Sequence, residues 1–99
     1  MSERLPIEDF DGYSFTAKSL TWGEAIDHDA KLKEASGLAE MISLRINELV
    51  EAVYAPGGSK VSDLRSLPND LIGSLAIAAS DTLVPKALRR GEATEKKED

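Results

Sequence analysis

The hydrophobic pattern of this chain changes its period near Leu20, and this change determines which fold class the sequence can support. Before Leu20, apolar side chains alternate with polar ones, which predicts a half-buried β-strand with one apolar face: Tyr13, Phe15 and Ala17. After Leu20, apolar side chains recur at steps of three and four residues, as in amphipathic helices. The sequence therefore predicts an α+β protein, mostly α, in which an N-terminal β-hairpin packs on three to four helices.

The expected hairpin has its turn at Asp11-Gly12, between two aromatic residues. This dipeptide suits the positive φ angles of a two-residue type I′ loop. The strand before it, residues 5–10, contains Pro6, which cannot donate to a ladder, so we expect that strand at the sheet edge. Because two strands alone are marginal in water, a helix or another chain should cover the aromatic face.

Thr21 and Glu24 predict the start of the first helix. The Thr21 hydroxyl can accept a hydrogen bond from a free amide, and Glu24 can reach back to the Thr21 amide, which together form a capping box. The helix is expected from Trp22 to about Ala35, with a thin inward face: Trp22, Ile26, Ala30 and the stem of Lys33. Trp22 is expected to pack beneath the aromatic face of the hairpin.

The strongest helical pattern covers residues 38–53, where large aliphatic side chains recur at helical steps: Leu38, Met41, Ile42, Ile46, Leu49 and Val53. The Pro-Gly-Gly sequence at 56–58 should end this helix. A short turn capped by Ser62-Asp63 is expected to follow, carrying Leu64 and Leu67.

A final helix is predicted from Pro68, because a proline at the first turn loses no hydrogen bond there. Its apolar stripe comprises six residues: Leu71, Ile72, Leu75, Ala76, Ala79 and Leu83. The helix should end before Pro85. Two amphipathic helices of this kind can simply bury one another, but their apolar side chains also leave surface for a partner.

Ninety-nine residues allow one small domain, which we expect over residues 1–85. Residues 86–99 contain nine charged side chains and no apolar period, so they are predicted to form a charged flexible tail. The chain has a formal net charge of −6 and no apolar run near the ~20 residues that cross a bilayer. Neither nucleic acid nor a membrane is therefore an expected partner.

No arrangement of residues predicts catalysis, a cofactor or a metal site. The sequence has no cysteine, so thiolate chemistry and disulfides are excluded. His28 stands between Asp27 and Asp29, but neighbouring helical residues point about 100° apart, so the three should not converge and His28 is expected to be solvated. The Pro-Gly-Gly-Ser-Lys sequence at 56–60 lacks the full phosphate-loop pattern and is expected to be a turn.

Three features in order carry a family resemblance: the Asp-Gly hairpin, Leu-Thr-Trp-Gly-Glu at 20–24, and Leu-Arg-Ser-Leu-Pro-Asn-Asp at 64–70. With the long amphipathic helix between them, they resemble the tail assembly chaperones of long-tailed bacteriophages. The resemblance covers roughly residues 5–83. It implies a non-enzymatic protein of the host cytoplasm that binds the tape-measure protein and helps recruit tail tube subunits.

Partner contacts are expected at apolar side chains that the centre of the core does not need: Trp22, Leu44, Val50 and Leu67. A groove between helices, rimmed by carboxylates, could hold an amphipathic helix of the client. Two alternatives from other classes stay open, namely a structural component of a phage tail or baseplate that remains in the virion, and a small helical regulatory protein that acts as a dimer. A homo-oligomer is compatible with each of these functions.

Overall fold

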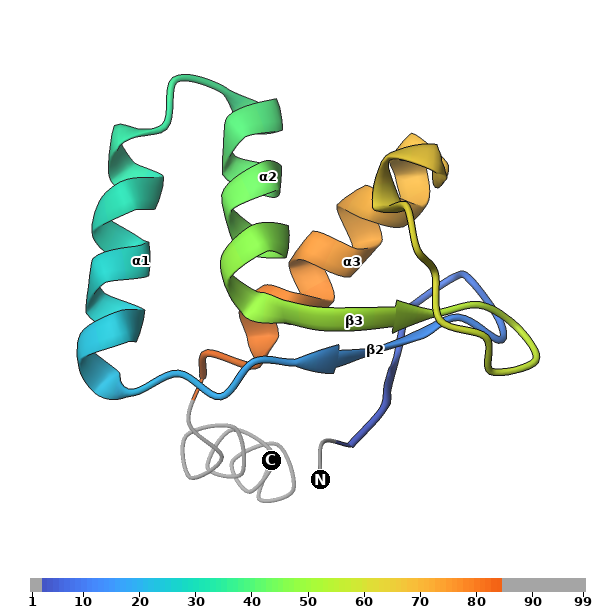
Figure 1. The fold of residues 1–99 in the computed structure, drawn as a ribbon. Coiled ribbons are helices and arrows are strands. Elements are labelled where there is room, and N and C mark those ends of the chain that lie inside the picture. The colour runs from blue at the N-terminus through green and yellow to red at the C-terminus, as the bar shows by residue number, and fades with distance from the viewer. Residues whose placement is uncertain (1–2, 85–99) are drawn as a thin grey trace, which may run out of the picture.

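Residues 3–84 of the computed structural model are described, and they combine a small antiparallel sheet with three α-helices (Figure 1). The elements follow in the order β1 (Leu5–Pro6), β2 (Ser14–Ala17), α1 (Trp22–Glu34), α2 (Leu38–Leu49), β3 (Val50–Tyr54), the 3₁₀ helix η1 (Leu64–Ser66) and α3 (Asn69–Asp81). The α+β class is thereby confirmed. The predicted tail, residues 86–99, lies outside the described residues.

The third strand is the largest departure from the sequence prediction. The long helix expected over 38–53 ends at Leu49, and the chain continues directly as β3. β3 pairs antiparallel with β2, so that Val53 lies opposite Phe15 and the sheet order is β1-β2-β3. A two-stranded ribbon would be marginal, and β-branched residues such as Val50 and Val53 fit a pleated surface well. Residues 50–53, which were predicted to end the helix, therefore belong to the third strand of the sheet.

The N-terminal hairpin is confirmed, but its predicted turn type is wrong. β1 and β2 pair antiparallel, and residues 7–13 form a wider loop between them. The Tyr13 amide donates to the Phe10 carbonyl at 3.1 Å across the Asp-Gly turn. Gly12 has a φ of 88°, whereas Asp11 has no positive φ. A type I′ turn needs positive φ at both central residues, so this is a different turn.

The turn at residues 56–58 is also confirmed, although it follows a strand instead of a helix. Gly57 and Gly58 both have positive φ, at 96° and 95°. The chain then runs back beside β3, where the Val61 amide donates to the Val53 carbonyl at 2.8 Å. This returning segment covers part of the outer edge of β3.

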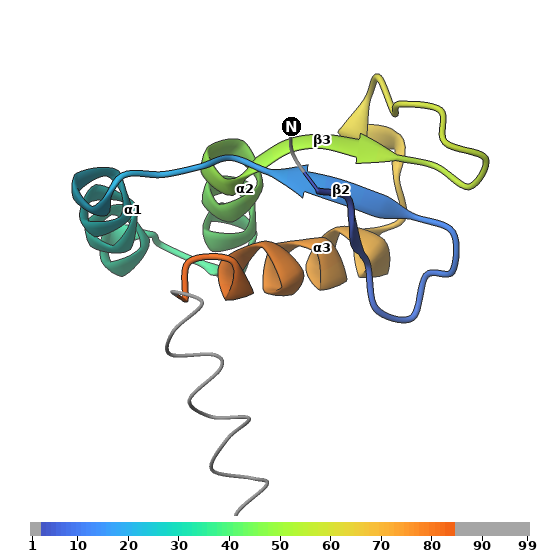
Figure 2. The same cartoon turned by 90° about the horizontal axis from the view of Figure 1, so that it is seen from below.

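The core lies between the sheet and the helices α2 and α3. Its fully buried apolar side chains come from the sheet and from both helices: Phe15, Leu49, Val53, Leu71 and Leu75. The predicted stripe on α3 is confirmed, because Leu71, Leu75, Ala76 and Ala79 are buried in this cluster. Figure 2 shows α3 beneath the sheet and α1 beside α2, away from the sheet.

The start of α1 agrees with the prediction, whereas its inward face does not. In the capping box, the Glu24 amide donates to Thr21 Oγ1 at 3.2 Å and the Thr21 amide donates to Glu24 Oε1 at 2.9 Å. The buried residues of α1 are His28 and Leu32. Every member of the predicted inward face is exposed: Trp22, Ile26, Ala30 and Lys33.

Trp22 in particular has 82% of its surface exposed and does not lie under the hairpin. The apolar face of the sheet packs in one cluster with side chains of α2 and α3, and α1 contributes no residue to that cluster. α1 packs instead against α2. The side of α1 that makes this contact carries Leu32, the one large aliphatic residue that is buried in α1.

Candidate functional site

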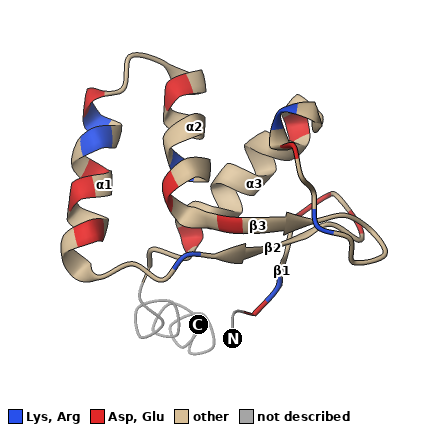
Figure 3. Cartoon of the chain, in the orientation of Figure 1, with Lys and Arg blue, Asp and Glu red and all other residues tan. Residues whose placement is uncertain are grey.

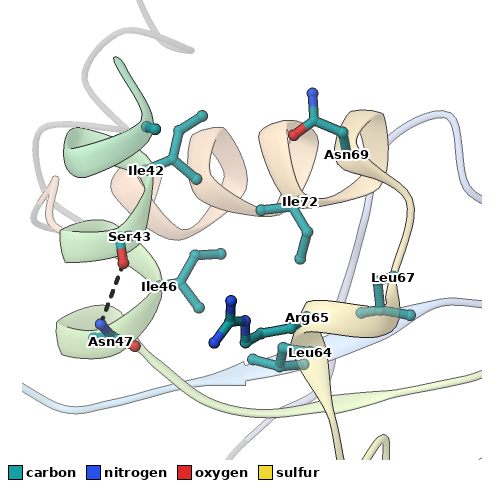
Figure 4. A pocket seen from close by; sticks show the side chains of 10 residues that line it. Ile42, Ser43, Ile46, Asn47, Leu64, Arg65, Leu67, Asn69 and Ile72 are labelled. Carbon is teal, nitrogen blue, oxygen red and sulfur yellow. Dashed lines mark hydrogen bonds between the residues drawn. The ribbon is translucent and has the colours of Figure 1, made fainter. Parts of the chain in front are cut away.

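A hollow of about 610 Å³ lies between α2 and the segment that leads from η1 into α3 (Figure 4). Ile42, Ile46 and Ile72 point into it from the two helices, and Leu64 and Leu67 flank it on the η1 side. We call this hollow the α2–η1 groove. Its lining residues are Ala39, Ile42, Ser43, Ile46, Asn47, Leu64, Arg65, Leu67, Asn69 and Ile72.

The η1 wall of the groove is fixed by local hydrogen bonds. The Asp63 carboxylate accepts from the Arg65 amide at 3.1 Å, and the Asp63 carbonyl accepts from Ser66 Oγ at 2.7 Å. This confirms the predicted capping role of Asp63. Pro68 then directs the chain into α3, as the sequence predicts for a proline at a helix start. Leu64 and Leu67 are therefore held at the groove by short-range interactions.

The charge of the groove differs from the expected carboxylate rim. Among its lining residues Arg65 alone is charged, and within the described residues its guanidinium forms no ion pair. The rest of the rim is polar and uncharged, with Asn47 Nδ2 donating to Ser43 Oγ at 3.5 Å. Acidic residues are scattered over the helices and loops (Figure 3). A ligand with an apolar face and a carboxylate near Arg65 would match this lining.

The four predicted partner-binding residues do not share one surface. Leu67 lines the α2–η1 groove. Trp22 lies on α1, at a separate hollow that it shares with Leu83 near the end of α3. Leu44 is half-buried on α2 outside the groove, and Val50 is buried in the core, so it offers no surface to a partner.

The other groove residues were not predicted as binding residues, because their sequence pattern places them in the core. Ile42 and Ile72 belong to the predicted core stripes of their helices, yet both remain partly exposed at the groove. Their position beside Leu64 depends on how η1 folds over α2, which no short-range pattern specifies. The sequence feature that could have indicated the groove is the three-residue spacing of Leu64 and Leu67 in front of Pro68.

The prediction for His28 is also wrong. It was expected to be solvated, but only 1% of its surface is exposed. Its Nδ1 lies 2.8 Å from Glu48 Oε1, while Lys31 Nζ lies 2.7 Å from Glu48 Oε2. The hydrogen bond from Lys31, followed by the one from His28, lowers the pKa of the Glu48 carboxyl below its usual range. As expected, Asp27 and Asp29 do not converge on the imidazole: both are exposed whereas His28 is buried, and Asp29 Oδ2 lies 3.3 Å from Lys33 Nζ.

This cluster joins α1 to α2 through polar contacts. His28 Nε2 is buried and has no hydrogen-bond partner within residues 3–84. In the same residues no group of three His, Asp or Glu side chains is placed to hold a metal ion.

No family model, curated protein or solved structure matches this chain. Within the described residues no helix is long and apolar enough to cross a membrane. The function proposed below consequently depends on the α2–η1 groove and on the resemblance seen in the sequence.

Proposed function

We propose that this chain is a non-enzymatic tail assembly chaperone of a long-tailed bacteriophage. In this function it acts in the host cytoplasm without a cofactor, binds the tape-measure protein and helps recruit tail tube subunits. The observation that carries the proposal is the α2–η1 groove, an open apolar hollow of about 610 Å³ beside a guanidinium that has no ion-pair partner among residues 3–84. The sequence resemblance over roughly residues 5–83 supplies the identity of the client.

The groove has the dimensions of a helix-docking site. Ala39 and Asn47 line its α2 wall and are eight residues apart, which is about 12 Å along the helix axis. This length accommodates about two turns of a client helix. Such a helix would place apolar side chains against Ile42, Ile46 and Ile72 and a carboxylate beside Arg65. A tape-measure protein, which is a long helical chain, offers many segments of this kind.

The test is a binding titration with the tape-measure protein encoded in the same genome, divided into overlapping segments. We expect one or a few amphipathic segments to bind the wild-type chain. Leu67→Ala removes an apolar wall and Arg65→Glu reverses the charge, and each should weaken binding roughly tenfold or more. Calorimetry or fluorescence anisotropy would measure the change.

Two control variants match these substitutions at positions outside the groove. Leu38→Ala truncates an exposed leucine of α2, and Lys60→Glu reverses an exposed charge after the turn at 56–58. Neither should alter binding. If no segment binds, or if the control variants weaken binding as much as the groove variants, the α2–η1 groove is not the client site.

The composition of purified phage particles separates this function from that of a structural tail or baseplate component. A chaperone should be present during assembly and missing from the finished particle. If the chain is present in purified virions in fixed proportion to the tail proteins, the structural function is correct and the chaperone proposal is wrong.

A further inference from the structure

A second apolar surface lies on the other side of Ile42 and is distinct from the α2–η1 groove. It contains a hollow of about 370 Å³ between α2 and α3. From α2 it takes Leu38, Met41, Ile42 and Arg45, and from α3 it takes Gly73, Ala76, Ile77 and Ser80. Each set follows the spacing i, i+3, i+4, i+7, so each helix presents a full stripe. We call this surface the α2–α3 face.

Large side chains on this face lack the cover that they have elsewhere in the fold. Leu38 is 72% exposed and Ile77 is 66% exposed, and Met41 is exposed as well. These three make up half of the large hydrophobic residues that are exposed in residues 3–84, and all three border one hollow. Contiguous apolar surface of this kind on a small acidic protein marks an interaction site.

The shape of the face favours a second copy of this chain as its occupant. Its exposed large side chains stand on both helices, with Leu38 and Met41 on α2 and Ile77 on α3. The small residues Gly73, Ala76 and Ser80 lie along the hollow. A Cβ atom added at Gly73 would meet nothing within 4 Å, so the surface there is open. A face that carries both projections and a depression can pair with itself, as a two-fold interface requires.

The charges at the face support the same pairing. Arg45 borders the hollow on the α2 side, and Asp81 follows the lining residue Ser80 at the end of α3. Within the described residues neither side chain forms an ion pair. In a two-fold pairing that lays α2 of one copy over α3 of the other, an Arg45–Asp81 contact would occur twice by symmetry.

We propose that the α2–α3 face joins two copies of this chain in a symmetric dimer, with α2 and α3 of both copies packed as a four-helix layer. On α2 the α2–η1 groove shares only Ile42 with this face and is otherwise lined by Ala39, Ser43, Ile46 and Asn47, so the groove stays accessible in such a dimer. The dimer would present two α2–η1 grooves. Its formation does not depend on which ligand binds in them.

Sedimentation equilibrium of the full chain, over a range of concentrations and without any client, tests the proposal. We expect a reversible species of twice the 10.7 kDa chain mass. Ile77→Glu and Leu38→Glu should each shift the chain to monomer, with unchanged far-UV circular dichroism. Both side chains are mostly exposed, so neither substitution should disturb the core. The matched control is Ser43→Glu, an exposed position on the groove side of α2, which should remain dimeric.

A charge exchange tests the orientation of the two copies. Arg45→Asp and Asp81→Arg should each weaken the dimer roughly tenfold or more, and the double variant should recover most of that loss, because each copy again meets an opposite charge. A wild-type chain that stays monomeric at millimolar concentration would overturn the proposal. So would a dimer that Ile77→Glu and Leu38→Glu leave intact, or a ladder of larger species, which a closed two-fold interface does not produce.

Discussion

At the scale of single residues, the most informative side chain is His28. It is buried at the contact of α1 with α2, where Nδ1 interacts with Glu48 and Nε2 has no partner within residues 3–84. A buried imidazole that satisfies one nitrogen gains a hydrogen bond and loses hydration at the other. The packing of His28 therefore contributes to the stability of the α1–α2 contact as much as its hydrogen bond does.

Replacing His28 with alanine should lower the free energy of unfolding by about 2 kcal/mol, because the substitution opens a cavity and removes the contact with Glu48. Urea denaturation would measure the loss. His28→Leu fills most of the volume and removes the unpaired nitrogen, so it should cost less than His28→Ala. Asp27→Ala, at an exposed neighbouring position, serves as control and should leave stability within about 0.5 kcal/mol. If His28→Ala behaves like this control, the imidazole is not part of the packed interface.

At the scale of secondary-structure elements, the junction of α2 and β3 organises the domain. The Val50 amide closes the helix by donating to the Ile46 carbonyl, and Val50 is also the first residue of the strand. Because no loop separates the two elements, the direction of α2 is coupled to the register of the sheet. α3 then packs beneath this unit and contributes Leu71 and Leu75 to the core.

Leu75→Ala should destabilise the protein by about 2–5 kcal/mol, since Leu75 is fully buried between α3 and the rest of the core. In so small a domain this loss could unfold much of the population at room temperature. Ile26→Ala is the matched control, because it truncates a half-exposed aliphatic side chain of α1 and should cost little. Thermal melting followed by circular dichroism compares the two, and equal melting temperatures would contradict the assigned core.

At the scale of the whole molecule, the sheet, α2 and α3 share one core, while α1 is attached at the side (Figure 2). The contact of α1 with the rest combines Leu32 with the polar cluster of His28, Lys31 and Glu48. The α2–η1 groove and the α2–α3 face lie on adjacent sides of α2 and meet at Ile42. One helix thus contributes to the core, to the proposed client site and to the proposed dimer.

The polar cluster should make stability depend on pH. Lys31 and then His28 lower the folded-state pKa of Glu48 below its ordinary value of 4.5. Ionised Glu48 therefore stabilises the fold above pH 4.5, and this contribution is lost as the pH falls through the lowered folded-state pKa. Glu48→Gln should melt below wild type near pH 7, and the difference should shrink as the pH falls below 4.5. A difference that stays constant over this range would show that the Glu48 charge contributes nothing.

Features that depend on neighbours along the chain could be predicted from the residues alone. Thr21 and Glu24 form their capping box because both partners lie within one helical turn. Asp63 and Pro68 fix η1 and the start of α3 in the same way. The apolar stripe of α3 was also predictable, because apolar residues that keep one helical period over a long segment are compatible with few other structures.

Features whose partners are remote in sequence depend on how the chain folds in three dimensions. Residues 50–53 fit a helical stripe and a strand equally well, and the pairing with β2, more than thirty residues earlier, selected the strand. His28 is buried because Glu48, twenty residues away, meets it across the α1–α2 contact. Trp22 and Ile26 are exposed because α2 and α3 already cover the sheet. Short apolar patterns specify which residues share a face, whereas competition for one small core determines which faces are buried.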